Sequence, residues 1–298
     1  MTAIVFTHPD CLRHDPGPGH PETPERLAAV LARLGADPTV AVRQAAAGAR
    51  EELLLAHPGG HLVRLEEMAR SGGGVMSLDT VMNDASWSAV LGATGAVTAA
   101  LAEAHAAGHH SFAAVRPPGH HALAARAMGF CLVNNVIIAA RQAQRLGRQR
   151  VLIIDWDVHH GNGTQALMEA DASIRYVSLH QHPWYPGTGM AEERGVGNVF
   201  NVPRGPGAPA ERYVADRWAA MVSATDDWSP DMILLSAGYD AMLGDPLGGF
   251  TLEPGDYAGL IARLRDRLPL VPIVGLLEGG YAPARVAEGV WATVRALE

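Results

Sequence analysis

The sequence predicts an α/β protein with a mostly parallel sheet and helices on both faces. Short apolar runs rich in β-branched residues alternate with longer helical patterns along the 298 residues, an order typical of βαβ units. The apolar runs are continuous rather than alternating with polar residues. Strands read this way when both faces of their sheet are covered.

The predicted elements follow one another with loops rich in proline and glycine between them. We expect seven strands, at 3–6, 111–115, 151–155, 174–179, 199–202, 232–236 and 270–277. We expect six helices, at 24–34, 86–107, 134–146, 209–224, 254–267 and 284–296.

The segment 86–107 is unusually apolar and allows two interpretations. It is long enough to suggest a membrane helix, but Glu103 and His105 interrupt it. We therefore predict a close-packed internal helix.

Composition limits the class of protein. Hydrophobic residues make up 48% and charged residues 18%, so a large core is expected and disorder is not. No internal repeat and no polar linker divides the sequence, which predicts one domain over residues 1–298.

Net charge and cysteine content indicate the class of binding partner and the redox state of the compartment. The net charge of −8 argues against non-specific nucleic-acid binding but is compatible with a small basic substrate. Two cysteines, Cys11 and Cys131, provide no disulfide framework and suit a reducing compartment. With neither a signal-peptide pattern nor a membrane partner predicted, we expect a cytoplasmic protein.

Polar side chains gather where four predicted strands end. "RPPGHH" follows the strand at 111–115, and "DWDVHHGNG" begins at the last residue of the strand at 151–155. "AGYDA" follows the strand at 232–236, and "EGGY" follows the strand at 270–277. Parallel α/β sheets bind ligands at the carboxyl ends of their strands, so this concentration predicts a ligand site.

Asp157 and His159 lie two residues apart, so an extended backbone places both side chains on one side. Together with Asp240 they are candidate ligands for Zn²⁺, or for Fe²⁺ or Co²⁺. The alternative is an ion-paired or capping aspartate in a loop. His160 is expected to face the other way and to have a structural role.

The adjacent histidines His120 and His121 suit a general base and an electrostatic stabiliser beside a metal. Each needs a partner that fixes its tautomer, and Asp155 and Asn162 are available. Both rings reach one site only if their loop is bent; otherwise the pair is structural. Tyr281, after two glycines, is a candidate to polarise a carbonyl, or a residue that packs at an edge.

Together these motifs resemble the zinc-dependent histone deacetylase superfamily, which includes acetylpolyamine amidohydrolases and bacterial deacetylase-like amidohydrolases. The resemblance covers nearly the whole chain in the family's order, and the Trp and Asn of "DWDVHHGN" resemble its class II branch. The motifs are "GHPETPERL", "VRPPGHHA", "GFCLVNN", "DWDVHHGNGT", "SLH", "PGTG", "SAGYDAMLGDPLGG" and "LEGGY".

The resemblance implies the arginase/deacetylase fold, with a single eight-stranded parallel sheet. It implies that a metal-dependent deacetylase occupies the whole chain and that zinc is bound by Asp157, His159 and Asp240. It also implies that His121 is the general base, positioned by Asn162, and that Tyr281 polarises the substrate carbonyl.

Further roles are implied in the same way. His120, tied to Asp155, is the electrostatic or proton-donating partner, and Arg26 lies near an internal channel. Gly129, Phe130 and Tyr185 line an acyl-lysine tunnel. A structural potassium ion is expected at backbone oxygens of Asp155, Asp157, His159 and Leu179, with side-chain oxygens from Asp155 and Ser178.

The substrate is predicted to be an N-acylated amine, most of all acyl-lysine. Leu247 follows "GDP", where one polyamine-selective branch has an acidic residue, and no long insertion follows "GHPETPERL". Asp79 and Asp84 either contact a substrate or are solvated loop charges, and the second reading is favoured.

Three alternatives stay open: an acetylpolyamine deacetylase, an arginase-like enzyme with two manganese ions, and a non-catalytic acyl-lysine binder. The sequence does not predict the oligomeric state.

Overall fold

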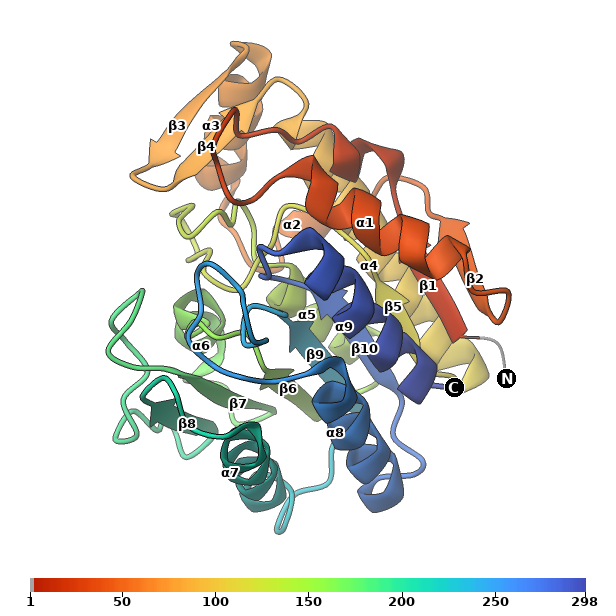
Figure 1. The fold of residues 1–298 in the computed structure, drawn as a ribbon. Coiled ribbons are helices and arrows are strands. Elements are labelled where there is room, and N and C mark those ends of the chain that lie inside the picture. Colours follow the sequence, from red (N-terminus) through yellow and green to blue (C-terminus); the bar gives the residue numbers. More distant parts are fainter. Residues whose placement is uncertain (1–2) are drawn as a thin grey trace.

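An eight-stranded parallel sheet lies at the centre of the molecule in the computed structural model, which describes residues 3–298 (Figure 1). Every neighbouring pair of strands in this sheet runs parallel. The predicted fold class is therefore confirmed. In order across the sheet, the strands are β2 (Val40–Gln44), β1 (Ala3–Thr7), β5 (Ser111–Ala113), β10 (Ile273–Leu277), β9 (Met232–Ala237), β6 (Val151–Asp155), β7 (Ile174–Gln181) and β8 (Val199–Arg204).

Helices cover the sheet in two layers (Figure 1). All six predicted helices are present, with ends shifted by one residue at most. On one face, four helices pack side by side in the order α1 (Pro24–Gly35), α9 (Pro283–Ala296), α8 (Pro254–Arg267) and α7 (Ala210–Ser223). On the other face lie α4 (Ser86–Ala107) and α5 (Asn135–Arg145).

Helix α4 is an internal helix, as predicted. It packs against β1, β5 and β10 and against α5. Alanine and glycine dominate its sequence, and their small side chains let the neighbouring segments approach closely. Among the described residues, no helix is long and apolar enough to cross a membrane.

Several elements were not predicted. Strand β2 lies at the edge of the sheet and exposes most of its residues, so it lacks the continuous apolar run of a buried strand. A separate antiparallel hairpin, whose strands β3 and β4 are rich in glycine and polar residues, stands apart from the main sheet. The unpredicted elements besides β2 are η1 (Pro9–Leu12), α2 (Arg50–Leu53), α3 (Gly59–Arg70), β3 (Gly73–Ser77), β4 (Thr80–Asn83) and α6 (Asn162–Met168).

The register of the central strands brings the predicted site residues to one edge of the sheet. Asp155, at the end of β6, is level with Ser178 of β7 and Ser236 of β9. Strands β9 and β10 end in register, at Ala237 and Leu277. The loops that follow β6, β9 and β10 therefore meet at the carboxyl edge, where parallel sheets bind ligands.

A close approach between α4 and the loop before α2 predicts a stability effect. A Cβ at Gly95 would overlap the carbonyl oxygen of Ala46 and would lie 2.6 Å from the backbone nitrogen of Gly48. We expect Gly95→Ala to lower the free energy of unfolding by about 1–3 kcal/mol, because backbone must move. Denaturant unfolding measures the change.

The matched control is Gly259→Ala in α8, where an added Cβ meets nothing within 4 Å. It should raise the free energy of unfolding by about 0.5–1 kcal/mol, since alanine favours helix over glycine. Equal effects of the two substitutions would contradict the proposed packing.

Candidate active site

Three buried side chains form a compact group at the carboxyl edge of the sheet. Asp157 and His159 follow β6 and Asp240 follows β9, and their ligating atoms all lie within 4.8 Å of one another. Nδ1 of His159 is 3.1 Å from an oxygen of Asp157 and 3.1 Å from an oxygen of Asp240. The structure thus brings together all three predicted metal ligands.

Backbone amides orient the two carboxylates. The N–H of Val158 donates to Oδ1 of Asp240 at 2.7 Å, and that of Gly279 donates to Oδ2 of Asp157 at 2.9 Å. The other oxygen of each carboxylate contacts Nδ1 of His159.

These two carboxylates repel one another in a buried site. Burial and the nearby charge of Asp157 raise the pKa of Asp240 to about 7. Two adjacent buried carboxylates are stable together only if a cation balances them. Two carboxylate oxygens and one imidazole nitrogen fit a divalent ion such as zinc and leave room for a further ligand.

The tandem histidines follow β5 on a bent loop, and their ring centroids are 4.0 Å apart. Nδ1 of His120 lies 3.1 Å from Oδ2 of Asp155, which also accepts a hydrogen bond from Tyr176. Burial disfavours the imidazolium, but the carboxylates of Asp157 and Asp155 outweigh it and raise the pKa of His120 to about 10. His120 therefore carries a proton at neutral pH.

His121 has the opposite charge preference. Its Nδ1 is 2.8 Å from the amide oxygen of Asn162, a neutral partner. Burial, together with the positive charge of His120 and His159, holds the pKa of His121 well below its usual range. Because an amide oxygen accepts the Nδ1 proton, Nε2 of His121 is left as a free acceptor.

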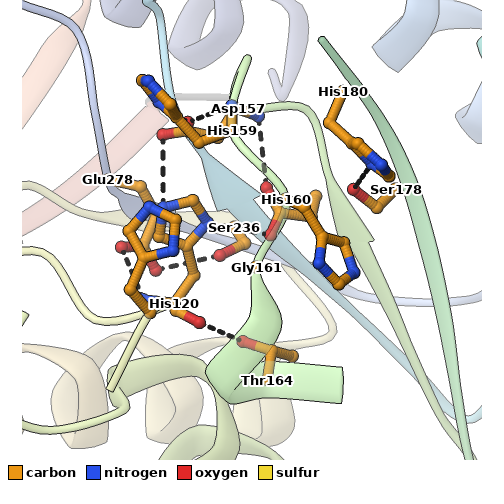
Figure 2. A network of polar contacts seen from close by, with 12 residues as sticks. His120, Asp157, His159, His160, Gly161, Thr164, Ser178, His180, Ser236 and Glu278 are labelled. Atoms are coloured by element: carbon orange, nitrogen blue, oxygen red, sulfur yellow. Dashed lines mark hydrogen bonds and ion pairs between the residues drawn. The ribbon is translucent and has the colours of Figure 1, made fainter. Parts of the chain in front are cut away.

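Glu278 is a buried site residue that the sequence analysis did not single out. One carboxylate oxygen accepts from the backbone N–H groups of Gly119 and His120, and the other accepts from the Ser236 hydroxyl. Figure 2 shows it next to His120. The available signal was a charged residue directly after the apolar strand β10.

Tyr281 lies beside the cavity described below, with its ring 5.6 Å from that of Phe130. The carboxylate of Asp245 accepts its backbone N–H at 2.6 Å. Burial raises the pKa of the Tyr281 hydroxyl well above its usual value, so it stays a neutral donor.

Arg26 is fully buried close to Tyr281, with its guanidinium carbon 4.9 Å from the centre of the tyrosine ring. It donates to the carbonyls of Gly280 and Glu278 and to the carboxylate of Glu22. Glu22 is a second residue that was not singled out, and its carboxylate also receives two hydrogen bonds from Arg116.

A cavity of about 240 Å³ opens above the metal-ligand group. The three predicted tunnel residues, Gly129, Phe130 and Tyr185, line it together with Leu247. Gly129 (φ 57°) and Phe130 (φ 66°) both adopt left-handed backbone, and a Cβ at Gly129 would overlap the His121 ring. The lining residues are Asp79, His121, Gly129, Phe130, His159, Trp184, Tyr185, Leu247 and Tyr281.

Asp79 is more than the solvated loop charge that the sequence favoured. Its Oδ1 accepts from the N–H of Gly129 and from the hydroxyls of Ser77 and Thr80, which fixes its carboxylate at the cavity. Asp84 is exposed, as that interpretation predicted.

His160 extends from the opposite side of its loop to His120 (Figure 2). Its ring nitrogens lie 2.8 Å from the Thr188 hydroxyl and 2.9 Å from the Gln165 carbonyl oxygen. It thus joins loops and contacts none of the three candidate metal ligands.

The residues of the expected potassium site are neighbours at the ends of β6 and β7, but several of their oxygens already have partners. Oδ1 of Asp155 accepts from the N–H of Asp157, and the Ser178 hydroxyl lies 2.9 Å from Nδ1 of His180. The Leu179 carbonyl accepts from Arg217 at 3.1 Å.

Cys11 and Cys131 are free and buried.

Comparisons with known proteins agree with this geometry. The family model described as histone deacetylase domain matches residues 20–297. An uncharacterized protein of Synechocystis is 39% identical over 305 residues, covering 100% of this chain and 99% of the relative. A histone deacetylase-like amidohydrolase of Pseudomonas aeruginosa is 35% identical over 282 residues, 90% of this chain and 74% of that protein.

A solved structure extends the match to three dimensions. The crystal structure of the HDA15 HD domain superposes with a TM-score of 0.94 at 34% sequence identity, covering 99% of this chain and 90% of that one. Family model, sequence relatives and fold therefore agree over nearly the full length, and this chain belongs to the histone deacetylase family.

Proposed function

We propose that this chain, as one catalytic domain over residues 1–298, hydrolyses acyl-lysine to lysine and a carboxylic acid. One observation carries the proposal. A group able to bind a divalent metal, a neutral histidine with a free Nε2 and a neutral tyrosine hydroxyl adjoin one small cavity. Amide hydrolysis needs these parts: an activated water, a base and an oxyanion donor.

Asp157, His159 and Asp240 would hold zinc. The donor set suits this ion, and zinc binding would offset the repulsion between the two buried carboxylates. When bound, the metal supplies Lewis acidity to a water molecule and to the amide carbonyl.

The protein's own groups perform the remaining work. Nε2 of His121 accepts the proton of the attacking water, and His120, held protonated by Asp155 and Asp157, stabilises the negative charge that develops. The Tyr281 hydroxyl donates to the oxyanion of the tetrahedral intermediate, a contribution of about 3–4 kcal/mol for one good donor. The leaving amine takes its proton from His121.

The cavity supports an extended, narrow substrate group. Its volume of about 240 Å³ lies below the range of roughly 300–1,000 Å³ typical of drug-sized ligands. Phe130 and Tyr185 provide aromatic walls for an alkyl chain, and Leu247 at the mouth is apolar where a polyamine would favour a carboxylate. Asp79 is placed to accept an N–H of a peptide backbone.

A substrate panel tests the proposal. Release of acid from acetyl-lysine peptides, longer acyl-lysines and acetylpolyamines is measured with and without chelator, together with the metal content of the chain. We expect turnover of acyl-lysine that chelator abolishes, with one metal per chain. Exclusive turnover of acetylpolyamines would favour an acetylpolyamine deacetylase. Two metals per chain would favour an arginase-like enzyme, and binding without hydrolysis would favour a non-catalytic acyl-lysine binder.

Removing the base or the oxyanion donor should slow the chemical step alone. We expect His121→Ala and Tyr281→Phe each to lower kcat by at least ~10²-fold while zinc content stays at the wild-type level. Steady-state kinetics and elemental analysis of the same samples check this. Near-normal kcat in either variant would contradict the assigned role.

Removing a ligand should abolish metal binding. Asp157→Ala is expected to lose zinc and activity together, because two protein ligands remain where structural and catalytic zinc sites use three or four. The control is Asp84→Ala, which alters an exposed carboxylate directly after β4 and should keep both zinc and activity. A fully metallated Asp157→Ala protein would exclude Asp157 as a ligand.

Exchanging the partner of His121 should shift the pH profile. In Asn162→Asp a carboxylate would face Nδ1 of His121, and a nearby negative charge stabilises the imidazolium and raises its pKa. Since the base acts in its neutral form, the acidic limb of kcat/KM should move to higher pH. An unchanged acidic limb would show that this histidine does not control it.

A further inference from the structure

A guanidinium is buried next to the catalytic aspartates. Arg217, on α7, is fully buried, and its Nη2 donates to the carbonyl oxygens of Leu179, at 3.1 Å, and Trp156, at 3.2 Å. Within residues 3–298, its Nε and Nη1 have no hydrogen-bond partner and no carboxylate is within 4.0 Å of it. The arginine is therefore neither an exposed charge nor half of a local ion pair.

Tyr257 and the active-site aspartates act on the charge of Arg217. Burial lowers the pKa of its guanidinium, while Tyr257, and after it the charges of Asp155, Asp157 and Asp240, act in the opposite direction. An arginine stays protonated even in such surroundings. The three buried aspartates carry negative charge, and the guanidinium adds to the positive charge that the protonated His120 and a bound divalent metal would supply.

The guanidinium of Arg217 lies at the ends of β6 and β7, where the family resemblance implies a potassium ion. The Leu179 carbonyl, one of its expected ligands, is a direct acceptor of Arg217. Trp156, the second acceptor, lies in sequence between Asp155 and Asp157, two further expected ligands. The site therefore fits a potassium ion poorly, since a second positive charge would be buried beside the guanidinium.

We propose that the guanidinium of Arg217 takes the place of the monovalent cation, so that this chain has a built-in positive charge beneath its active site. A covalently attached charge does not exchange with the solution. Folding and metal retention of this chain should then be independent of potassium. The inference rests on the fold and the charges, and its test needs no substrate, so it stands or falls separately from the proposed function.

The experiment measures thermal stability of the zinc-loaded full chain while KCl replaces N-methyl-D-glucamine chloride at constant ionic strength. A ligand that binds the folded state raises the melting temperature in a saturable way. We expect the wild-type Tm and zinc content to be the same in both salts. A saturable rise of Tm with KCl, absent with LiCl, would overturn the proposal.

Two variants sharpen the result. Arg217→Met keeps much of the side-chain volume but removes the charge, and we expect its Tm and zinc retention to become dependent on KCl. Arg217→Lys keeps the charge and should stay independent of KCl. A folded Arg217→Met protein with wild-type stability in both salts would also overturn the proposal, because the charge would then be dispensable.

The matched control is Arg212→Met, which removes an arginine from the exposed side of the same helix, where it faces Asp216. It should show no dependence on potassium. If Arg217→Met fails to fold in either salt, the wild-type titration and the Arg217→Lys protein still decide between a bound potassium ion and the guanidinium.

Discussion

The burial of carboxylates at the carboxyl edge of the sheet is the constraint on which the site depends. Asp155, Asp157 and Asp240 have no exposed surface, and a buried negative charge persists only with hydrogen bonds and positive charge around it. Backbone amides, a protonated His120 and the buried Arg217 surround them. The metal-binding group and the residues that support it are thus one balanced electrostatic unit.

Two neighbouring histidines show how partners determine chemistry. His120 and His121 share a loop and are both buried, yet one faces carboxylates and the other the amide of Asn162. The carboxylates keep His120 protonated, whereas burial and the neighbouring charge of His120 keep His121 neutral. Opposed charge states in adjacent rings are what an enzyme needs to stabilise charge and to accept a proton in the same step.

The buried strands and the metal-ligand group could be predicted because each leaves a strong local pattern. Continuous apolar runs predicted seven of the eight strands, and polar residues directly after them predicted Asp157, His159 and Asp240. Strand β2 was missed because Val40 alone among its five residues is buried, which leaves no apolar run to recognise. Contacts between segments that are distant in sequence determine the roles of three other residues, Glu278, Arg217 and Asp79. Such contacts leave no periodic pattern in the sequence.

The cavity is built from two parts of the fold that differ in how freely they can change. His121, His159 and Tyr281 line it from the loops at the carboxyl edge of the central sheet, where a substitution disturbs the buried charges. One wall includes Asp79, from the turn of the β3–β4 hairpin outside that sheet, and the neighbouring Leu78 is fully exposed. Substitutions at exposed hairpin positions such as Leu78 can therefore accumulate without damage to the reaction chemistry. Within this architecture, new substrate preferences have an evolutionary route that leaves the hydrolytic machinery intact.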